Sequence, residues 1–198
     1  MFKRVVLVMT MIALLLLVGC GKAPETEMQN ADTAMQAARS AEAEQYAADT
    51  YQMAMDTLNA ATSSKQEQDS KFALFRSYGK AKELFMSAQV LAEQSATEAA
   101  AEKARMQSEV MTLINEVQAT LGTADKAIAG APKGKGTKAD IELLKNDLAA
   151  AKAGFEAAKA DFEAGKYIAA KVKLDAVKAK AEGVISDVEK AKSKKTPK

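Results

Sequence analysis

The sequence offers few side chains with strong chemistry, and its single cysteine, Cys20, is the most nucleophilic of them. The 198-residue chain contains no His, no Trp and one Cys. Without His, the Ser-His-Asp and Cys-His catalytic arrangements and the usual zinc sites are excluded. One Cys forms neither a disulfide within the chain nor an iron–sulfur ligand set. We therefore predict no catalytic residues, no metal ligands and no cofactor.

Two short motifs match patterns found at enzyme sites. Ser77 and Lys80 have the Ser-x-x-Lys spacing of penicillin-recognising enzymes, but the companion Ser-Asp-Asn and Lys-Thr-Gly motifs are absent. Gly130 and Lys135 come close to a phosphate-binding loop, but the spacing is one residue short and no apolar strand precedes it. We interpret the first as a chance match and the second as a linker.

The first twenty residues are typical of an export signal. Lys3 and Arg4 precede an apolar run over residues 5–18. Fourteen residues span about 21 Å as a helix, less than the roughly 30 Å hydrocarbon core of a bilayer. The run therefore favours a signal-peptide h-region over a permanent membrane span.

This run ends in Leu17, Val18, Gly19 and Cys20, which resembles the lipobox of bacterial lipoproteins. The resemblance implies that Cys20 receives a diacylglyceryl group and that the chain is cleaved before it. Two or three acyl chains anchor a protein stably where one does not. Because no Asp follows Cys20, the resemblance also implies an outer-membrane location facing the periplasm in a host with two membranes. The alternative is a buried structural cysteine.

Charge is distributed unevenly along the chain. Residues 23–130 contain 9 basic and 16 acidic side chains, whereas residues 131–198 contain 16 and 10. The boundary, residues 130–137, is the only stretch dense in Gly and Pro, which indicates a linker. We therefore predict these divisions: a signal peptide (1–19), a tether (20–27), an acidic helical segment (28–129), a linker (130–137), a basic antiparallel helical hairpin (138–192) and a basic tail (193–198).

The basic hairpin carries the clearest helical pattern. Two runs of apolar residues step by three and four, with a turn at residues 164–166 between them. The runs are Ile141, Leu144, Leu148, Ala151, Phe155, Ala158 and Phe162, then Tyr167, Ala170, Leu174, Val177, Ala181, Val184 and Val188. This seven-residue repeat predicts two antiparallel, coiled-coil-like helices.

The acidic segment has weaker patterns. Alanines over residues 31–41 indicate one helix, and Tyr51 to Leu58 a second, with a candidate break near residues 46–49. A long third stretch over residues 66–121 includes Phe72 and Phe75 in its apolar set, and its middle, residues 99–101, is expected to be exposed or kinked. We predict an all-α fold of elongated antiparallel helical hairpins, TPR-like or coiled-coil-like.

A weak internal repeat relates the two halves of the mature chain. Residues 78–88 align with residues 167–177, each with an aromatic residue followed by a small Ala and then a large apolar residue. The pattern resembles tetratricopeptide-like hairpins, in which Ala lets helices approach closely. With the lipobox, the chain is similar to uncharacterised Ala-rich helical lipoproteins of bacterial envelopes over residues 26–96 and, less well, 140–190. This resemblance implies no catalytic residues.

The heptad register gives the predicted hairpin two different edges. On one edge Asp147 is expected to face Lys180, and Asp161 to face Lys166. The other edge is a ridge formed by Lys145, Lys152, Lys159, Lys171 and Lys178. Like charges at this spacing repel, so the ridge requires anions nearby. They are supplied either by the chain's own acidic residues or by an external polyanion such as a cell-wall polymer.

These observations favour a connecting role over catalysis. We expect a non-enzymatic, lipid-anchored protein of the cell envelope that acts as a scaffold, spacer or adaptor to another protein or to the cell wall. The alternative is a regulatory or accessory subunit of an envelope enzyme or export complex. Nucleic acid is excluded as a partner, since an exported chain does not meet it and no interleaved aromatics could stack on bases. The oligomeric state stays open, because the same heptads can pair between chains.

Overall fold

The computed structural model describes residues 22–132 and 138–194. These residues form helices and one 3-10 turn, with no strand among them, so the predicted all-α fold is confirmed. The elements are α2 (Glu25–Ser40), α3 (Ala43–Tyr46), α4 (Ala48–Asp69), the 3-10 turn η1 (Ala73–Phe75), α5 (Gly79–Ala129), α6 (Lys138–Glu163) and α7 (Tyr167–Lys194).

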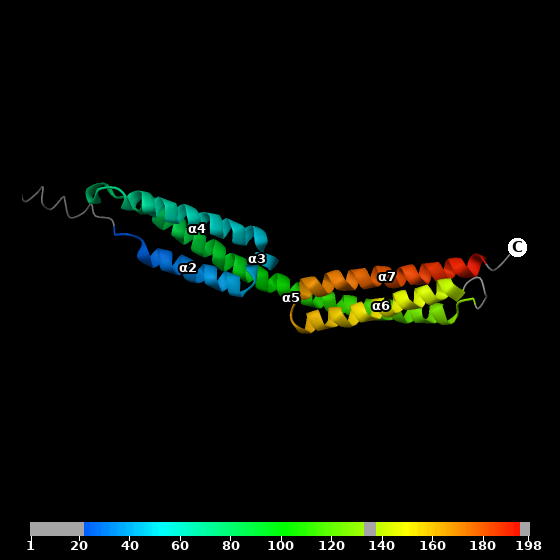
Figure 1. Ribbon diagram of the computed structural model, residues 1–198. Coiled ribbons are helices and arrows are strands. Elements are labelled where there is room, and N and C mark those ends of the chain that lie inside the picture. Colours follow the sequence, from blue (N-terminus) through cyan, green and yellow to red (C-terminus); the bar gives the residue numbers. More distant parts are fainter. Residues whose placement is uncertain (1–21, 133–137, 195–198) are drawn as a thin grey trace, which may run out of the picture. The chain divides into compact units, whose positions relative to one another are not determined.

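The chain forms two compact units that divide between residues 102 and 103. We refer to them as the first and second bundles. The first contains α2, α3, α4 and the first part of α5, and the second contains the rest of α5 with α6 and α7 (Figure 1). This division differs from the boundary predicted at residues 130–137, because α5 continues without interruption past residue 102. Residues 133–137 of that predicted linker lie outside the described residues.

The first bundle is held together largely by alanine. Its helices pack through small side chains around one fully buried aromatic ring, that of Phe85. Alanine at these contacts lets the helix axes approach closely. The central cluster comprises Ala31, Ala61, Ala81, Phe85 and Ala88, with Met28, Leu58 and Leu84 packed against it.

The predicted break near residues 46–49 is present. After α2, Glu42 adopts a left-handed conformation (φ 59°), and the short α3 follows. Ala47 then takes a non-helical conformation (φ −144°, ψ 47°) and separates α3 from α4. The two irregular residues reverse the chain between α2 and α4 without a proline.

Two other expectations for this segment were wrong. Helix α2 begins at Glu25, so residues 25–27 belong to it and not to the predicted tether. The stretch 66–121 is not one helix, because α4 ends at Asp69 and α5 begins at Gly79. Between them, residues 70–78 form a loop, here called the α4–α5 loop. In contrast, α5 runs unbroken through residues 99–101, and Ala99 is buried.

The second bundle contains the predicted hairpin, whose turn is built by its backbone. Gly165 has φ +74°. The Lys166 N–H donates to the Asp161 carbonyl (2.9 Å), and the Gly165 N–H donates to the Phe162 carbonyl (3.0 Å). This is a Schellman motif, which requires a left-handed residue that Gly provides at low cost. The rings of Phe162 and Tyr167 lie 5.4 Å apart, centroid to centroid, across the turn.

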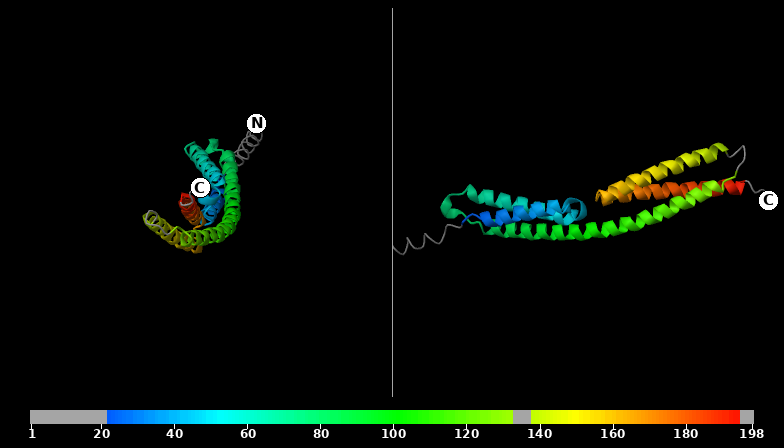
Figure 2. Two further views of the ribbon diagram at one scale, coloured as in Figure 1. Left: turned by 90° about the vertical axis from the view of Figure 1, so that its right-hand side faces the viewer. Right: turned by 90° about the horizontal axis from the view of Figure 1, so that it is seen from below.

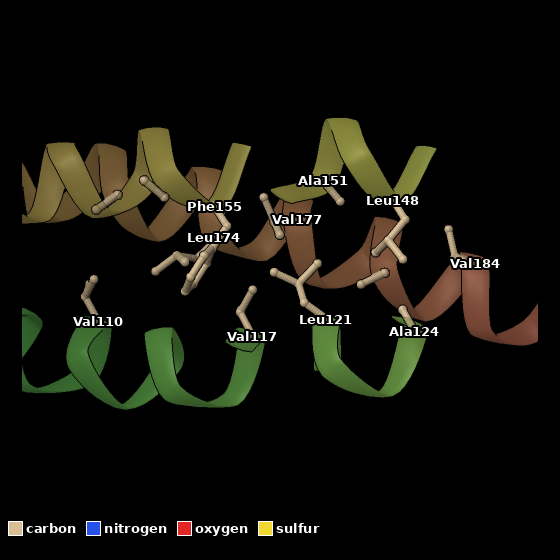
Figure 3. Close-up of a cluster of buried hydrophobic side chains, with 13 residues drawn as sticks. Val110, Val117, Leu121, Ala124, Leu148, Ala151, Phe155, Leu174, Val177 and Val184 are labelled. Carbon is tan, nitrogen blue, oxygen red and sulfur yellow. The ribbon is translucent and has the colours of Figure 1, made fainter. Parts of the chain in front are cut away.

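A third helix covers the hairpin. Figure 3 shows side chains of α5 pointing toward those of α6 and α7 in one shared core. Leu174 of α7 is fully buried there, between Phe155 of α6 and the α5 face. The α5 face consists of Val110, Val117, Leu121 and Ala124. Most residues of the two predicted apolar runs are therefore confirmed as core residues, in a core shared with α5. Leu144, Phe162 and Tyr167 are only partly buried against it, and Ile141 lies outside the cluster.

One close helix contact gives a prediction. A Cβ atom added at Gly154 of α6 would lie 3.0 Å from Val177 Cγ2, whereas one added at Gly183 of α7 would meet nothing within 4 Å. Gly183→Ala is expected to stabilise the second bundle by about 0.5–1 kcal/mol, because Ala is the better helix former. Gly154→Ala should gain less or destabilise, because Val177 must move. Urea unfolding followed by circular dichroism measures both, and equal gains would show that α6 and α7 do not pack this closely.

Candidate functional site

The predicted lipidation site is Cys20, at the end of the lipobox-like residues. Leu17, Val18, Gly19 and Cys20 lie outside the described residues. Within the described part of the chain, no helix is both long enough and apolar enough to cross a membrane. In the same part, no group of three or more Cys, Asp and Glu residues is arranged to hold a metal ion.

The five lysines of the predicted ridge lie in the second bundle, and three of them pair with α5. Lys152 binds Asp125 (Nζ–Oδ1 2.8 Å), and Lys178 binds Glu116 (Nζ–Oε2 3.0 Å). Lys171 binds Glu109 (Nζ–Oε1 2.9 Å) and lies 3.7 Å from Asp175. The hydrogen bonds that Lys171 and Lys178 donate to Glu109 and Glu116 raise the pKa of both lysines. The lysine edge of the hairpin is thus the edge on which α5 packs.

The remaining two ridge lysines pair within α6. Lys145 binds Glu142 (3.2 Å), and Lys159 binds Glu156 (3.1 Å). The Lys159 ammonium also lies 5.6 Å from the centroid of the Phe155 ring. Every lysine of the ridge therefore has an anionic partner in its own bundle. This arrangement supports the internal source of anions, one of the two left open by the sequence.

The opposite edge of the hairpin agrees in part with the heptad register. Asp147 binds Lys180 as predicted (3.3 Å). Asp161 was expected to pair with Lys166, but it binds Lys173 instead. Lys166 lies in the turn, where its backbone N–H donates a hydrogen bond to the Asp161 carbonyl. The Schellman geometry therefore replaces the simple heptad pairing at that end.

The sequence did not predict a small open hollow in the first bundle. It has a volume of about 270 Å³ and is lined by residues 46–50 and Glu98. Glu98 accepts hydrogen bonds from Thr50 Oγ1 (2.6 Å) and Gln94 Nε2 (2.7 Å), which lower its pKa. A carboxyl group with a lowered pKa is ionised at neutral pH and is a poor general acid. The predicted helix break near residues 46–49 was the only sequence signal near this hollow.

The Ser-x-x-Lys match is not set up for catalysis. Ser77 lies in the α4–α5 loop, and its backbone N–H donates to Gln68 Oε1 (3.1 Å). Lys80 lies in the first turn of α5. The motif requires Ser and Lys on successive turns of one helix, and here Ser77 precedes the helix.

The α4–α5 loop displays large apolar side chains instead of burying them. Phe72, Leu74 and Phe75 are 70%, 56% and 75% exposed, although the sequence pattern had placed both phenylalanines on a buried helical stripe. Tyr78 closes the loop by donating its hydroxyl to Asp69 Oδ1 (2.6 Å). This loop and the start of α2 lie at the same end of the first bundle (Figure 2), where Lys65 pairs with both Glu25 and Asp69.

Comparison with known proteins gives one match. Residues 26–111 are similar to the family described as Domain of unknown function (DUF4398). The matched range covers less than half of the chain, from α2 into α5, and the family description names no activity. No curated protein and no solved structure matches the chain.

The ion pairs of the second bundle lead to a prediction. Changing Lys171 and Lys178 to Gln removes two contacts between α7 and α5, so the thermal midpoint of the second bundle should fall. The difference from the unmodified protein should shrink in high salt, which screens exposed pairs. Lys190→Gln is the control, because Lys190 pairs with Asp187 on its own helix. Because these lysines are paired within the bundle, the amount of protein that sediments with isolated cell wall should be the same for both variants. If the Lys171/Lys178 variant no longer sedimented with the cell wall, an external polyanion would be the partner of the ridge.

The carboxylates at the loop end predict acid sensitivity. Hydrogen bonds from Tyr78 and then Lys65 lower the pKa of Asp69, and a hydrogen bond from Lys82 lowers that of Glu27. A lowered folded-state pKa stabilises the fold at all pH values above the ordinary pKa of about 4, and this stabilisation is lost as pH falls through the lowered values.

The first bundle should therefore lose stability below about pH 4, where these carboxylates take up protons. Asp69→Asn should lower the thermal midpoint at pH 7 and change it little in strong acid, because the parent side chain is neutral there too. Asp32→Asn, at an exposed position of α2, is the control. Thermal unfolding followed by circular dichroism measures both midpoints. An equal fall in the midpoint of the Asp69→Asn protein at both pH values would show that the charge of Asp69 does not stabilise the bundle.

Proposed function

We propose that this chain is a non-enzymatic, lipid-anchored protein of the cell envelope that serves as a spacer or adaptor. The anchor is Cys20, supported by the order of Lys3 and Arg4, the apolar run over residues 5–18 and the lipobox-like residues 17–20. In a host with two membranes, the protein lies on the outer membrane and faces the periplasm. Its partner is a second envelope protein or a cell-wall polymer.

The observation that carries this proposal is how the chain enters and leaves each bundle. In the first bundle it enters at Glu25, beside Lys65 near the end of α4. It leaves through α5 beyond Glu98, which bonds Thr50 at the start of α4. Entry and exit are therefore at opposite ends of the bundle.

The second bundle has the same property. The chain enters it along α5, where Glu109 pairs with Lys171 at the start of α7. Gly130, directly after the other end of α5, lies beside Lys192 near the end of α7. The C-terminal end of α7 is thus at the far end of the bundle from the entry point.

A bundle that is entered at one end and left at the other adds its full length to a connection. Helix α4 has 22 residues and α7 has 28. At 1.5 Å per residue, these helices are about 33 Å and 42 Å long. Hairpins that return the chain to its starting point would add almost no reach. This path suits a spacer better than it suits an enzyme, whose chain path need not have any such direction.

The proposal is tested first at the anchor. Cys20→Ala should abolish incorporation of labelled palmitate and leave the precursor uncleaved, because the thiol that carries the lipid is missing. Mass spectrometry of the purified native protein should find Cys20 as the first residue, carrying acyl chains. Retention of Met1 together with an unmodified Cys20 would overturn the proposal.

A further inference from the structure

The three exposed side chains of the α4–α5 loop are too closely grouped to be ordinary surface exposure. Phe72, Leu74 and Phe75 lie within four residues, each more than half exposed, and the two phenyl rings are 6.4 Å apart. Scattered apolar side chains are normal on protein surfaces, but a contiguous apolar cluster marks a contact site. In a chain with 5% aromatic residues, leaving two of them in water is a notable cost.

Hydrogen bonds hold the loop in a conformation that leaves these side chains exposed. Arg76 donates from Nε to the Lys71 carbonyl and from Nη2 to the Asp69 carbonyl, both at 2.9 Å. The Phe75 N–H donates to the Phe72 carbonyl within η1. Several polar groups of the loop are thereby bonded within the loop or to the end of α4. What the loop tip offers to a partner is the apolar part of its side chains.

The basic side chains of the first bundle gather at the same end. Residues 22–102 contain seven basic and thirteen acidic side chains. Of these basic residues, Arg39, beside Tyr51, is the one far from the loop. The other six lie on the loop, next to it or just before α2: Lys22, Lys65, Lys71, Arg76, Lys80 and Lys82. Five carboxylates lie at this end too, and three of its lysines pair with them: Lys65, Lys71 and Lys82. Six basic and five acidic side chains give this end a net charge of +1, whereas Arg39 and the other eight carboxylates give the rest of the bundle a net charge of −7. The rest of the bundle is therefore the part that an anionic surface repels.

The described chain also begins at this end. Lys82 pairs with Glu27 (2.9 Å) and Lys65 with Glu25 (3.3 Å), so the start of α2 is held beside the end of α4 and the start of α5. Cys20 is five residues before Glu25, and five residues span at most about 18 Å. A lipid on Cys20 would therefore bring the membrane surface to the end of the bundle that carries the apolar loop.

We propose that the α4–α5 loop is a second membrane contact, inserting Phe72, Leu74 and Phe75 among the lipid headgroups while this end of the bundle, which carries no net negative charge, faces anionic phospholipid. Apolar side chains flanked by Lys and Arg are the composition that settles at this boundary. The inference rests on the proposed lipidation of Cys20. With two contacts, the first bundle is oriented at the membrane, and its acidic body points away from it.

The absence of Trp from the chain makes a direct test available, because a single introduced indole is then the only one in the protein. The full-length Phe75→Trp protein, processed in its host and purified in detergent, is reconstituted into vesicles of phosphatidylethanolamine and phosphatidylglycerol. Its indole emission should shift to shorter wavelength relative to the protein in buffer. The emission should also be quenched when the acyl chains carry bromine near the headgroup. Val90→Trp is the matched control, at a 60% exposed position on α5 of the same bundle, and should show neither change.

Vesicle flotation measures the anchor separately. Flotation of the Phe75→Trp protein with an unshifted, unquenched indole emission would overturn the loop contact while leaving the anchor standing, and would point to a protein as the occupant of the loop. Failure to float, with unmodified Cys20 by mass spectrometry, would overturn both proposals. Equal quenching in the Phe75→Trp and Val90→Trp proteins would also overturn the loop contact, because it would mean that the bundle lies flat on the membrane.

Discussion

Close packing of helices through alanine is the constraint on which the rest of the structure depends. A stripe of alanines buries little apolar area per residue, so two such helices alone gain little free energy by pairing. Ala31, Ala61 and Ala81 come from three different helices and are all fully buried in one cluster. The first bundle therefore requires three helices to enclose a core this thin. Phe85, the largest fully buried side chain, fills the space that the alanines leave.

In the second bundle, charge decides which face of the hairpin is covered. The apolar seam between α6 and α7 has one lysine-rich edge, and α5 brings Glu109, Glu116 and Asp125 to it. Each of these pairs is exposed enough to contribute little on its own. Together they match α5 to that edge in one register, while Val110, Val117 and Leu121 supply the buried area. The apolar contacts stabilise the bundle, and the ion pairs specify its arrangement.

The sequence predicted the hairpin well because Leu148, Phe155 and Leu174 repeat at helical spacing and Gly165 punctuates the turn. It did not reveal that α5 covers the hairpin. The Gly- and Lys-rich stretch after Gly130 predicted a break between helices, and α5 does end at Ala129 and α6 begin at Lys138. The division into two compact units occurs instead within α5 and leaves no mark in composition. Phe72 and Phe75 are three residues apart, so periodicity alone assigned them to a helix, although the chain had already turned after Asp69.

The lysine ridge was deduced from the hairpin in isolation. The sequence therefore predicted that acidic residues of the chain could pair with it, but not which ones on α5. The hollow beside Glu98 depends on backbone angles at Ala47, which no residue type in the sequence dictates. The lipobox-like motif, in contrast, is visible only in the sequence, because its residues lie outside the described part of the chain.

The direction of the chain path has a mechanical consequence. In the first bundle α2 and α5 both begin at the loop end, so a pull between the start of α2 and the exit along α5 draws the two helices past each other lengthwise. All the contacts between them then bear load at once, whereas peeling two helices apart from one end breaks the contacts one at a time. A bundle loaded in this way therefore resists extension along its axis more strongly than it resists peeling from one end.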